Sequence, residues 1–267
     1  MKTYYKFHKK IFLIMLASFF VTSFASSTNL PSTNYEQKVK SILQKMSYKA
    51  QKEIKISDYD EFVSDLQIVL NDETFYNKGD IPLYSLVDKT HYLSSDYVPK
   101  NLIHLTQNSS YNINRNDLSL TEDTEKNLRI MAEDAKIDGI TLLVSSTYRS
   151  YEYQKNLFAR YVKQEGLEQA MRFSAKEGTS QHQLGTAIDF GSITYSFINT
   201  KQGQWLYKNA YKYGFSLSFP EGYEDVTGYR YECWHYRFLG KNACLFQKKY
   251  FNDIQQYMLE FINLWKK

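Results

Sequence analysis

Two side chains with the character of metal ligands stand seven positions apart in the middle of the chain, where His182 precedes Asp189 across a turn that contains Gly185. The residues after this turn are apolar and partly β-branched, which predicts a strand that carries Asp189. A third ligand is expected some fifty residues later at His235, which again stands close to an acidic residue, Glu232. Two imidazoles and one carboxylate leave a fourth tetrahedral position open for water, which is the pattern of a catalytic zinc site.

The predicted strand gives a second reason to expect a metal. Along it, Ala187 and Asp189 share one face, while Ile188 and Phe190 share the other. A carboxylate among apolar neighbours must be paired, hydrogen-bonded or metal-bound, because an isolated buried charge is strongly destabilising. Metal binding is the simplest of these explanations for Asp189.

The spacing of Glu232 and His235 makes a geometric demand on the backbone. Residues three apart point to opposite faces of a regular strand, so both reach one metal only if the chain is bulged or turned between them. Given such a turn, His235 binds the metal while Glu232 lies beside it. Glu232 then takes a proton from the attacking water and passes it to the leaving amine.

Arg149 is the cation expected to act on the substrate. It follows the predicted buried strand Ile140–Val144, at a position from which a guanidinium can reach over a cleft. Its fork of N–H donors suits a substrate carboxylate or a developing oxyanion. A surface arginine in a turn is the alternative that this stretch of sequence leaves open.

The first 25 residues have the composition of a signal peptide. Four lysines precede the apolar run Ile11–Phe24, which is too short for a comfortable membrane span, and small residues follow at Ser23 and Ala25. We therefore expect an exported protein without stable membrane insertion after cleavage, with an uncleaved N-terminal anchor as the alternative.

Charge and cysteine content narrow the function further. The chain has 33 Lys and Arg against 29 Asp and Glu, and loss of the four N-terminal lysines makes the remainder formally neutral. A neutral chain gives no support to nucleic-acid binding, which needs a basic surface. Export implies an oxidising compartment, where Cys233 and Cys244 are able to close one disulfide loop; two free buried thiols are the alternative.

The patterning along the chain mixes helices and short strands without regular alternation, which favours an α+β fold with an antiparallel sheet. Helical spacing of apolar residues predicts two helices between Tyr35 and Asn77, forming an N-terminal extension. The other expected helices follow a capping box at Ser119–Glu122, follow a cap at Ser150, and span Lys201–Tyr213 and Tyr250–Trp265. Strands are expected at Leu83–Asp88, Ile140–Val144, Phe215–Phe219 and Tyr229–Phe238.

Two motifs carry a resemblance to a known family. They read Ser180-x-His182-x-x-Gly185-x-Ala187-x-Asp189 and Glu232-x-Trp234-His235-x-Arg237. Together they resemble the VanY-type D-alanyl-D-alanine carboxypeptidases, zinc peptidases that share their fold with the Hedgehog signalling domain. The segment Thr147–Ser150 with Gln154 is similar to that family's Tyr-Arg-Ser segment, and the likeness covers roughly residues 80–248. Glu177 and Cys233 stand where the family often has proline.

The resemblance implies hydrolysis of a terminal D-alanine from peptidoglycan stem peptides in the bacterial periplasm or cell envelope. It implies His182, Asp189 and His235 as Zn²⁺ ligands, Glu232 as catalytic base, Arg149 as anion or carbonyl clamp, and Gln154 and Ser180 as substrate contacts. An L,D-carboxypeptidase, an endopeptidase on the same peptides, and a non-catalytic zinc-containing peptide-binding module are the alternatives. The expected organisation is a signal peptide at 1–25, a linker and helical extension at 26–79, a carboxypeptidase domain at 80–248 and a C-terminal amphipathic helix at 249–267.

Overall fold

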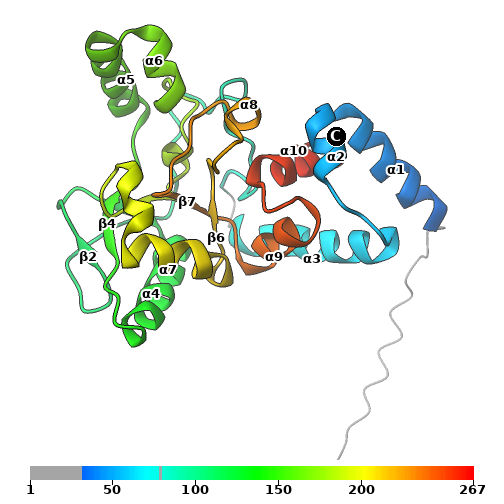
Figure 1. The fold of residues 1–267 in the computed structure, drawn as a ribbon, viewed down its shortest axis with the longest axis horizontal. Helices are drawn as coiled ribbons and strands as arrows, with labels where there is room; N and C mark the ends of the chain where they lie inside the picture. The colour runs from blue at the N-terminus through cyan, green and yellow to red at the C-terminus, as the bar shows by residue number, and fades with distance from the viewer. Residues whose placement is uncertain (1–31, 78–79) are drawn as a thin grey trace, which may run out of the picture. The chain divides into compact units, whose positions relative to one another are not determined.

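A five-stranded mixed sheet lies at the centre of the protein, whose computed structural model describes residues 32–77 and 80–267 (Figure 1). The predicted signal peptide, residues 1–25, lies outside the described residues. Three of the four neighbouring strand pairs are antiparallel, as expected, and the edge pair β2–β4 is parallel. In spatial order the strands are β2 (Asn112–Ile113), β4 (Leu143–Ser146), β5 (Ala187–Phe190), β7 (His235–Phe238) and β6 (Phe215–Leu217).

The register of the two central strands places the predicted chemistry on one face of the sheet. Asp189 of β5 is the cross-strand partner of His235 of β7, and Ile188 is the partner of Tyr236. Because side chains alternate along strands, Asp189 and His235 point to one side, and Ile188 and Tyr236 point to the other. All eight residues of the two strands are buried, so both faces are covered.

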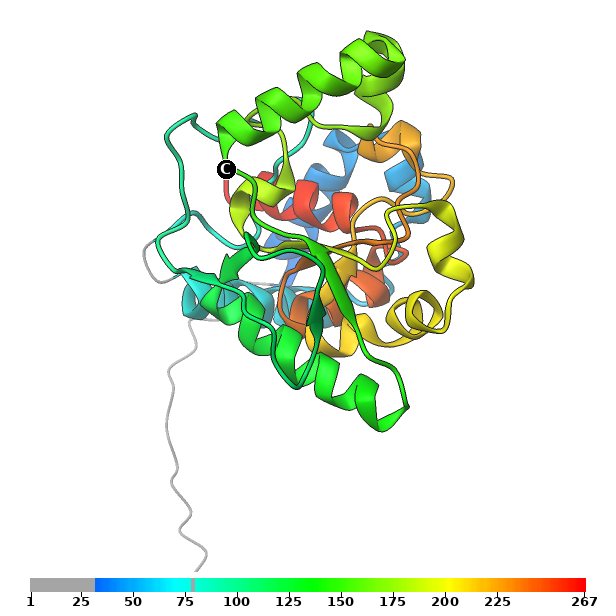
Figure 2. The same ribbon diagram turned by 90° about the vertical axis from the view of Figure 1, so that its left-hand side faces the viewer.

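Helices cover the sheet (Figures 1 and 2). The helices between the strands are α4 (Glu122–Ile137), α5 (Tyr151–Glu165), α6 (Leu167–Phe173), α7 (Lys201–Asn209) and α8 (Glu224–Thr227), with 3₁₀ turns η1 (Gln181–Leu184), η2 (Tyr195–Asn199) and η3 (Ala210–Tyr213). A second, two-stranded antiparallel sheet pairs β1 (Leu102–His104) with β3 (Ser119–Thr121). Among the helices of the described residues, none is long and apolar enough to cross a membrane.

The N-terminal and C-terminal helices form one layer. Three helices, not two, precede the first strand: α1 (Ser32–Lys45), α2 (Tyr48–Glu53) and α3 (Tyr59–Asn77). They pack against α9 (Lys241–Tyr250) and α10 (Gln255–Trp265), and Figure 1 shows the two groups side by side. At their junction the ring of Phe62 lies 5.1 Å from Phe246, 4.9 Å from Tyr250 and 5.2 Å from Phe261, centroid to centroid. The buried residues of both groups belong to the same core cluster as the sheet.

The segment predicted as the strand Leu83–Asp88 is irregular, apart from a single bridge between Asp88 and His91. Its backbone groups hydrogen-bond to side chains and do not pair with a neighbouring strand. The fully buried guanidinium of Arg237 donates Nη2 hydrogen bonds to the carbonyl oxygens of Leu83 at 2.8 Å and Ser85 at 2.9 Å. That strand prediction was wrong because the sequence gives no sign of a distant arginine occupying these carbonyls.

Several other boundaries differ from the expectations. Ser119 lies in strand β3 and is not a cap, because its N–H bonds Thr147 Oγ1 and α4 begins at Glu122 with Thr121 at the N-cap. The predicted tail helix is broken before Gln255, where Asn252 and Asp253 adopt positive φ angles of 52° and 59°. Strand β4 begins at Leu143 instead of Ile140, and β7 begins only at His235. The cap predicted at Ser150 is confirmed.

Cys233 and Cys244 are both buried and free, so the disulfide alternative does not hold. Cys244 lies on α9, and it lines a cavity on the Tyr236 face of the sheet. Cys233 lies in the turn before β7, where its Sγ is 3.7 Å from the carbonyl oxygen of Thr194.

Candidate metal centre

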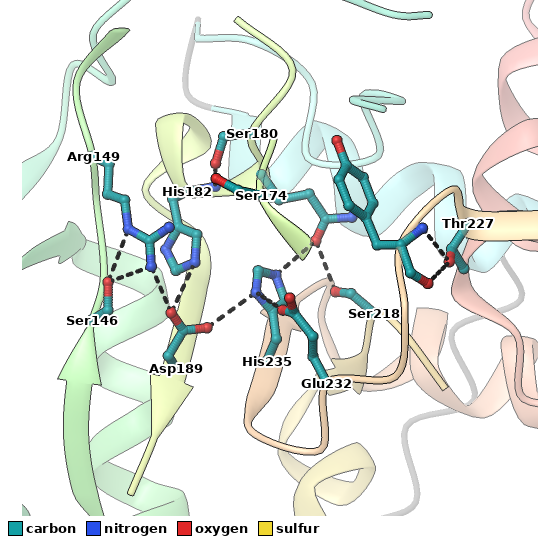
Figure 3. A network of polar contacts seen from close by, with 12 residues as sticks. Ser146, Arg149, Ser174, Ser180, His182, Asp189, Ser218, Thr227, Glu232 and His235 are labelled. Carbon is teal, nitrogen blue, oxygen red and sulfur yellow. Dashed lines mark hydrogen bonds and ion pairs between the residues drawn. The ribbon is translucent and has the colours of Figure 1, made fainter. Parts of the chain in front are cut away.

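The three predicted ligands converge. His182 in η1, Asp189 in β5 and His235 at the start of β7 each offer one ligand atom, and these atoms lie within 4.8 Å of one another. Nε2 of His182 is 3.2 Å from Oδ2 of Asp189, and Nδ1 of His235 is 3.1 Å from Oδ1 of the same carboxylate (Figure 3). All three side chains are no more than 5% exposed. The three candidate ligands therefore form a compact group beneath the protein surface.

Local backbone structure explains how a short segment supplies two ligands. Ser180 caps η1, its Oγ accepting a hydrogen bond from the N–H of His182, and Gly185 ends the turn with its N–H bonded to the carbonyl oxygen of His182. Gly185 has a φ of 69°, in the left-handed region that favours glycine. A Cβ atom there would lie 2.9 Å from Cδ2 of Leu102. The glycine thus lets the chain reverse directly from His182 into β5.

Gly185→Ala is expected to weaken metal binding as well as stability. The left-handed conformation costs an L-residue about 1–2 kcal/mol, and relief of the contact with Leu102 shifts the turn that holds His182. Gly139→Ala is the matched control, because Gly139 also has a positive φ, 74°, but a Cβ there meets nothing within 4 Å. Both variants should lower the melting temperature; only Gly185→Ala should raise the zinc dissociation constant. Equal zinc affinity in the two variants would contradict this role.

The turn required between Glu232 and His235 is present. The N–H of His235 donates to the carbonyl oxygen of Glu232 at 3.2 Å, so β7 begins only after the chain has reversed. Oε2 of Glu232 consequently lies 3.6 Å from Nδ1 of His235 (Figure 3). Glu232 is buried, and it stands next to the cluster without being one of its three closest donors.

Hydrogen bonds behind the two imidazoles fix which nitrogen of each faces the carboxylate. Nδ1 of His182 is 2.7 Å from the carbonyl oxygen of Thr147, and Nε2 of His235 is 3.2 Å from Oε1 of Gln181. A carbonyl oxygen only accepts, so the proton of His182 is on Nδ1. Ser218 Oγ, at 2.7 Å, orients the Gln181 amide so that Oε1 faces His235. The nitrogens that face Asp189 are therefore Nε2 of His182 and Nδ1 of His235.

This arrangement fits a bound cation. Two nitrogen lone pairs face an ionised carboxylate, and Oδ1 of Asp189 accepts no hydrogen bond from any described residue. Burial, assisted by the charge of Arg149, lowers the pKa of His182 to about 4, so near neutrality no additional proton fills the gap. Burial opposes ionisation of Asp189, but His182, His235 and Arg149 together hold its pKa well below the ordinary value. The two imidazoles and one carboxylate are the donor set of a catalytic zinc site.

Glu232 has the opposite electrostatic environment. Burial and then the negative charge of Asp189 raise the pKa of Glu232 well above its ordinary value, while Arg149 and Arg230 act in the other direction. A divalent cation next to it lowers that pKa again. A carboxyl group subject to these opposing effects is suited to exchange a proton near neutral pH.

Arg149 lies at the site, but its guanidinium is already bound. Its Nη2 is 2.7 Å from Oδ2 of Asp189, and its Nε and Nη2 donate to Oγ of Ser146 at 3.0 and 2.8 Å (Figure 3). An irregularity in the β4–β5 ladder, between Val144 and Ser146, brings Ser146 opposite Asp189. Arg149 is 18% exposed and thus borders the cleft while it stabilises the negative charge of Asp189.

A cleft of about 440 Å³ opens onto the cluster between the α5–α6 hairpin and the segment that precedes β7. Ser180 and Arg149 line it, together with Glu232 and the three metal-site residues. Gln154, expected as a substrate contact, does not line it. Its buried Nε2 donates to the carbonyl oxygen of Ala175 at 2.7 Å, so it fixes the chain that borders the cleft.

Three features of the site were missed from the sequence. Gln181 holds the ring of His235, and the carbonyl of Thr147 holds His182; the only signal for Gln181 was its position between Ser180 and His182. Arg230, two residues before Glu232, also lines the cleft. Because Arg230 lies in a segment predicted as a strand, nothing in the sequence placed it at the cleft.

Comparisons with known proteins decide the family. The model of the VanY family, D-alanyl-D-alanine carboxypeptidase, matches residues 117–241. The putative carboxypeptidase YodJ of Bacillus subtilis is 34% identical over 189 residues, which is 68% of either chain. The chain belongs to the VanY family. A D-alanyl-D-alanine carboxypeptidase of Enterococcus faecium is 25% identical, over 65% of this chain and 56% of that enzyme.

Solved structures agree on the fold of this VanY-family protein. The LdcB LD-carboxypeptidase matches with a TM-score of 0.59 and 33% identity, over 67% of this chain and 84% of that one. The VanY D,D-pentapeptidase of a VanB-type resistance cassette, solved with Zn(II), matches with a TM-score of 0.56 and 24% identity, over 66% and 98%. The predicted α+β fold of the Hedgehog/DD-peptidase type and the predicted enzyme class, a zinc metallopeptidase, are confirmed. The division into domains stays a prediction.

Proposed function

We propose that this protein is an exported, zinc-dependent carboxypeptidase that removes a terminal D-alanine from peptidoglycan stem peptides. One observation carries the proposal: three buried donors face one another in a cleft, and a fourth side chain, the carboxyl of Glu232, lies beside them. A merely structural metal site would close the coordination sphere and would have no need of a neighbouring acid. Membership in the VanY family supports the assignment.

Each residue of the site has a separate chemical role in this reaction. A zinc ion held by His182, Asp189 and His235 supplies a Lewis acid that acidifies water and polarises a carbonyl. Glu232 takes one proton from the attacking water as its oxygen bonds to the scissile carbonyl carbon. The same proton goes to the leaving nitrogen when the C–N bond breaks, and the second proton of the water passes from the new carboxyl group to the released amine. The products are a shortened peptide with a carboxylate and a free amino acid with an ammonium group.

Other groups, held in place by the fold, orient the candidate ligands and the substrate. Thr147 and Gln181 orient the two imidazoles, and Arg149 keeps Asp189 ionised. Arg149 also presents positive charge at the edge of the cleft, where an oxyanion develops next to the cluster. Ser180, whose Oγ is buried at the floor of the cleft, is the remaining substrate contact in this proposal.

An L,D-carboxypeptidase is a second candidate, favoured by the 33% identity to the LdcB LD-carboxypeptidase. The two activities differ in the residue before the scissile bond. A D,D-enzyme shortens a pentapeptide that ends in D-alanyl-D-alanine, and an L,D-enzyme shortens a tetrapeptide whose single D-alanine follows an L-centre.

Defined muropeptides test both candidates. We expect the protein purified without residues 1–25 and loaded with zinc to release one D-alanine per pentapeptide, measured by mass spectrometry of the products. A chelator should stop the reaction, and added zinc should restore it. Release from tetrapeptides alone would replace the D,D-assignment with the L,D-one, and cleavage of cross-linked dimers would indicate an endopeptidase. Binding of these peptides without hydrolysis would indicate a non-catalytic peptide-binding module and would contradict the proposal.

A further inference from the structure

The cleft contains two arginines that differ in their ionic partners. Arg149 pairs with Asp189, a member of the metal cluster. Arg230, on the segment leading to Glu232, forms no ion pair with any residue in the ranges 32–77 and 80–267. The positive charge of Arg149 is thus already compensated within the protein, whereas that of Arg230 is available to a ligand.

The position of Arg230 is held by its surroundings. Its N–H donates to the carbonyl oxygen of Arg172 at 2.9 Å, which ties this segment to the end of α6. Its guanidinium carbon lies 4.4 Å from the ring centroid of Phe173 and 5.8 Å from that of Tyr195. Cation–π contacts of this kind fix the plane of the guanidinium but leave its N–H edge unbonded.

The neighbouring Arg172 forms the kind of ion pair that Arg230 lacks. Arg172 uses Nε and Nη2 to bind both oxygens of Glu224, at 2.6 and 2.7 Å. Arg230 lies close to the same helix, α8, yet Glu224 is engaged by Arg172. Arg230 instead lines the cleft, next to Glu232 and Trp234.

We propose that Arg230 binds a carboxylate of the substrate and so makes the cleft selective for acidic peptides over their amides. This inference rests on the proposed function, since it assumes a peptide in the cleft. A guanidinium that lines the cleft without an ion-pair partner attracts a substrate carboxylate there. Its two parallel N–H groups match the two oxygens of a carboxylate.

Two carboxylates of a stem peptide have this chemistry. One is the C-terminal carboxylate of the residue that is released, and the other is a free carboxylate on an acidic residue further from the scissile bond. Recognition of the first makes Arg230 a determinant of exopeptidase action. Recognition of the second lets Arg230 distinguish a stem peptide with a free carboxylate from one in which this group is amidated.

Matched pairs of peptides separate these sources. One pair has a free or amidated C-terminus, and the other has a free or amidated acidic residue within the stem. For each peptide, kcat and KM are measured with the zinc-loaded protein and with Arg230→Gln, Arg230→Lys and Arg160→Gln. Arg160 is exposed on α5 and does not line the cleft, so its variant removes a positive charge from outside the cleft.

We expect Arg230→Gln to lower kcat/KM for the acid of one pair by about 10- to 100-fold, mainly through KM, and to leave its amide nearly unchanged. Arg230→Lys should recover part of the loss, and Arg160→Gln should behave as the unaltered protein. The pair whose discrimination collapses identifies the carboxylate. Equal losses on acids and amides in both pairs, or no loss on any, would overturn the proposal.

A binding measurement keeps this test separate from that of the proposed function. If the unaltered protein hydrolyses none of the peptides, the carboxypeptidase assignment fails, but calorimetry with the same four peptides still reports on Arg230. Weaker binding of one acid to Arg230→Gln, with its amide unaffected, supports the role of Arg230. Identical binding of acids and amides by the unaltered protein excludes it.

Discussion

Glu232→Gln is expected to lower kcat by about 10²- to 10⁴-fold while zinc stays bound. The amide has nearly the shape of the carboxyl group, but it cannot take a proton from water and return it to the leaving nitrogen. Glu232 is not among the three donors of the metal cluster, so the site should keep its affinity for the ion. The measurement is turnover of a muropeptide substrate together with the zinc content of the purified variant.

Glu152→Gln is the matched control for this variant. Glu152 is an exposed acid on α5 that lies outside the cleft, and its loss should leave turnover unchanged. Near-normal turnover by Glu232→Gln would show that another group handles the proton. Loss of zinc by the same variant would move Glu232 from the catalytic base to the set of ligands.

His182→Ala is expected to raise the zinc dissociation constant by more than about 100-fold and to abolish hydrolysis. Loss of a group that only orients a ligand typically costs 10- to 100-fold in affinity, and loss of the ligand itself should cost more. Removal of the ring also leaves the carbonyl of Thr147 without its hydrogen bond and Asp189 with one partner fewer. Zinc affinity is measured by competition with a chromophoric chelator.

His104→Ala serves as the control, because His104 is an exposed residue on β1, remote in sequence from the cluster. It should bind zinc with unaltered affinity. Full zinc occupancy in His182→Ala at limiting metal would exclude His182 as a ligand. A variant that loses zinc but also unfolds is distinguished by its circular dichroism spectrum.

The convergence of the three candidate ligands could be predicted from the sequence because it depends on residue types and on a short local connection. His182 and Asp189 are joined by six residues that include Gly185, so few backbone paths are available to that segment. The turn between Glu232 and His235 could also be predicted. Residues three apart on a regular strand point to opposite faces, so both reach one ion only if the chain turns between them.

Other features depend on partners far away in the sequence. The pairing of Arg149 with Asp189 links positions 40 residues apart, and local patterning does not specify it. The same holds for Arg237, whose guanidinium replaces the strand pairing expected around Leu83. At the C-terminus the apolar spacing predicted a helix from Tyr250, whereas α10 begins only at Gln255. Asn252 and Asp253, before it, have positive φ angles, and the buried Gln247 side chain bonds Asp253.

The aromatic junction around Phe62 bears on how the catalytic unit is delimited. Family likeness alone would place its start near residue 117 and its end near residue 241. A protein cut to those limits would lack the rings of Phe62, Phe246, Tyr250 and Phe261 and would strip the sheet of one covering layer. We therefore expect the shortest version that folds by itself to be set by where the hydrophobic core closes, from α1 to α10, and not by where the likeness to relatives stops.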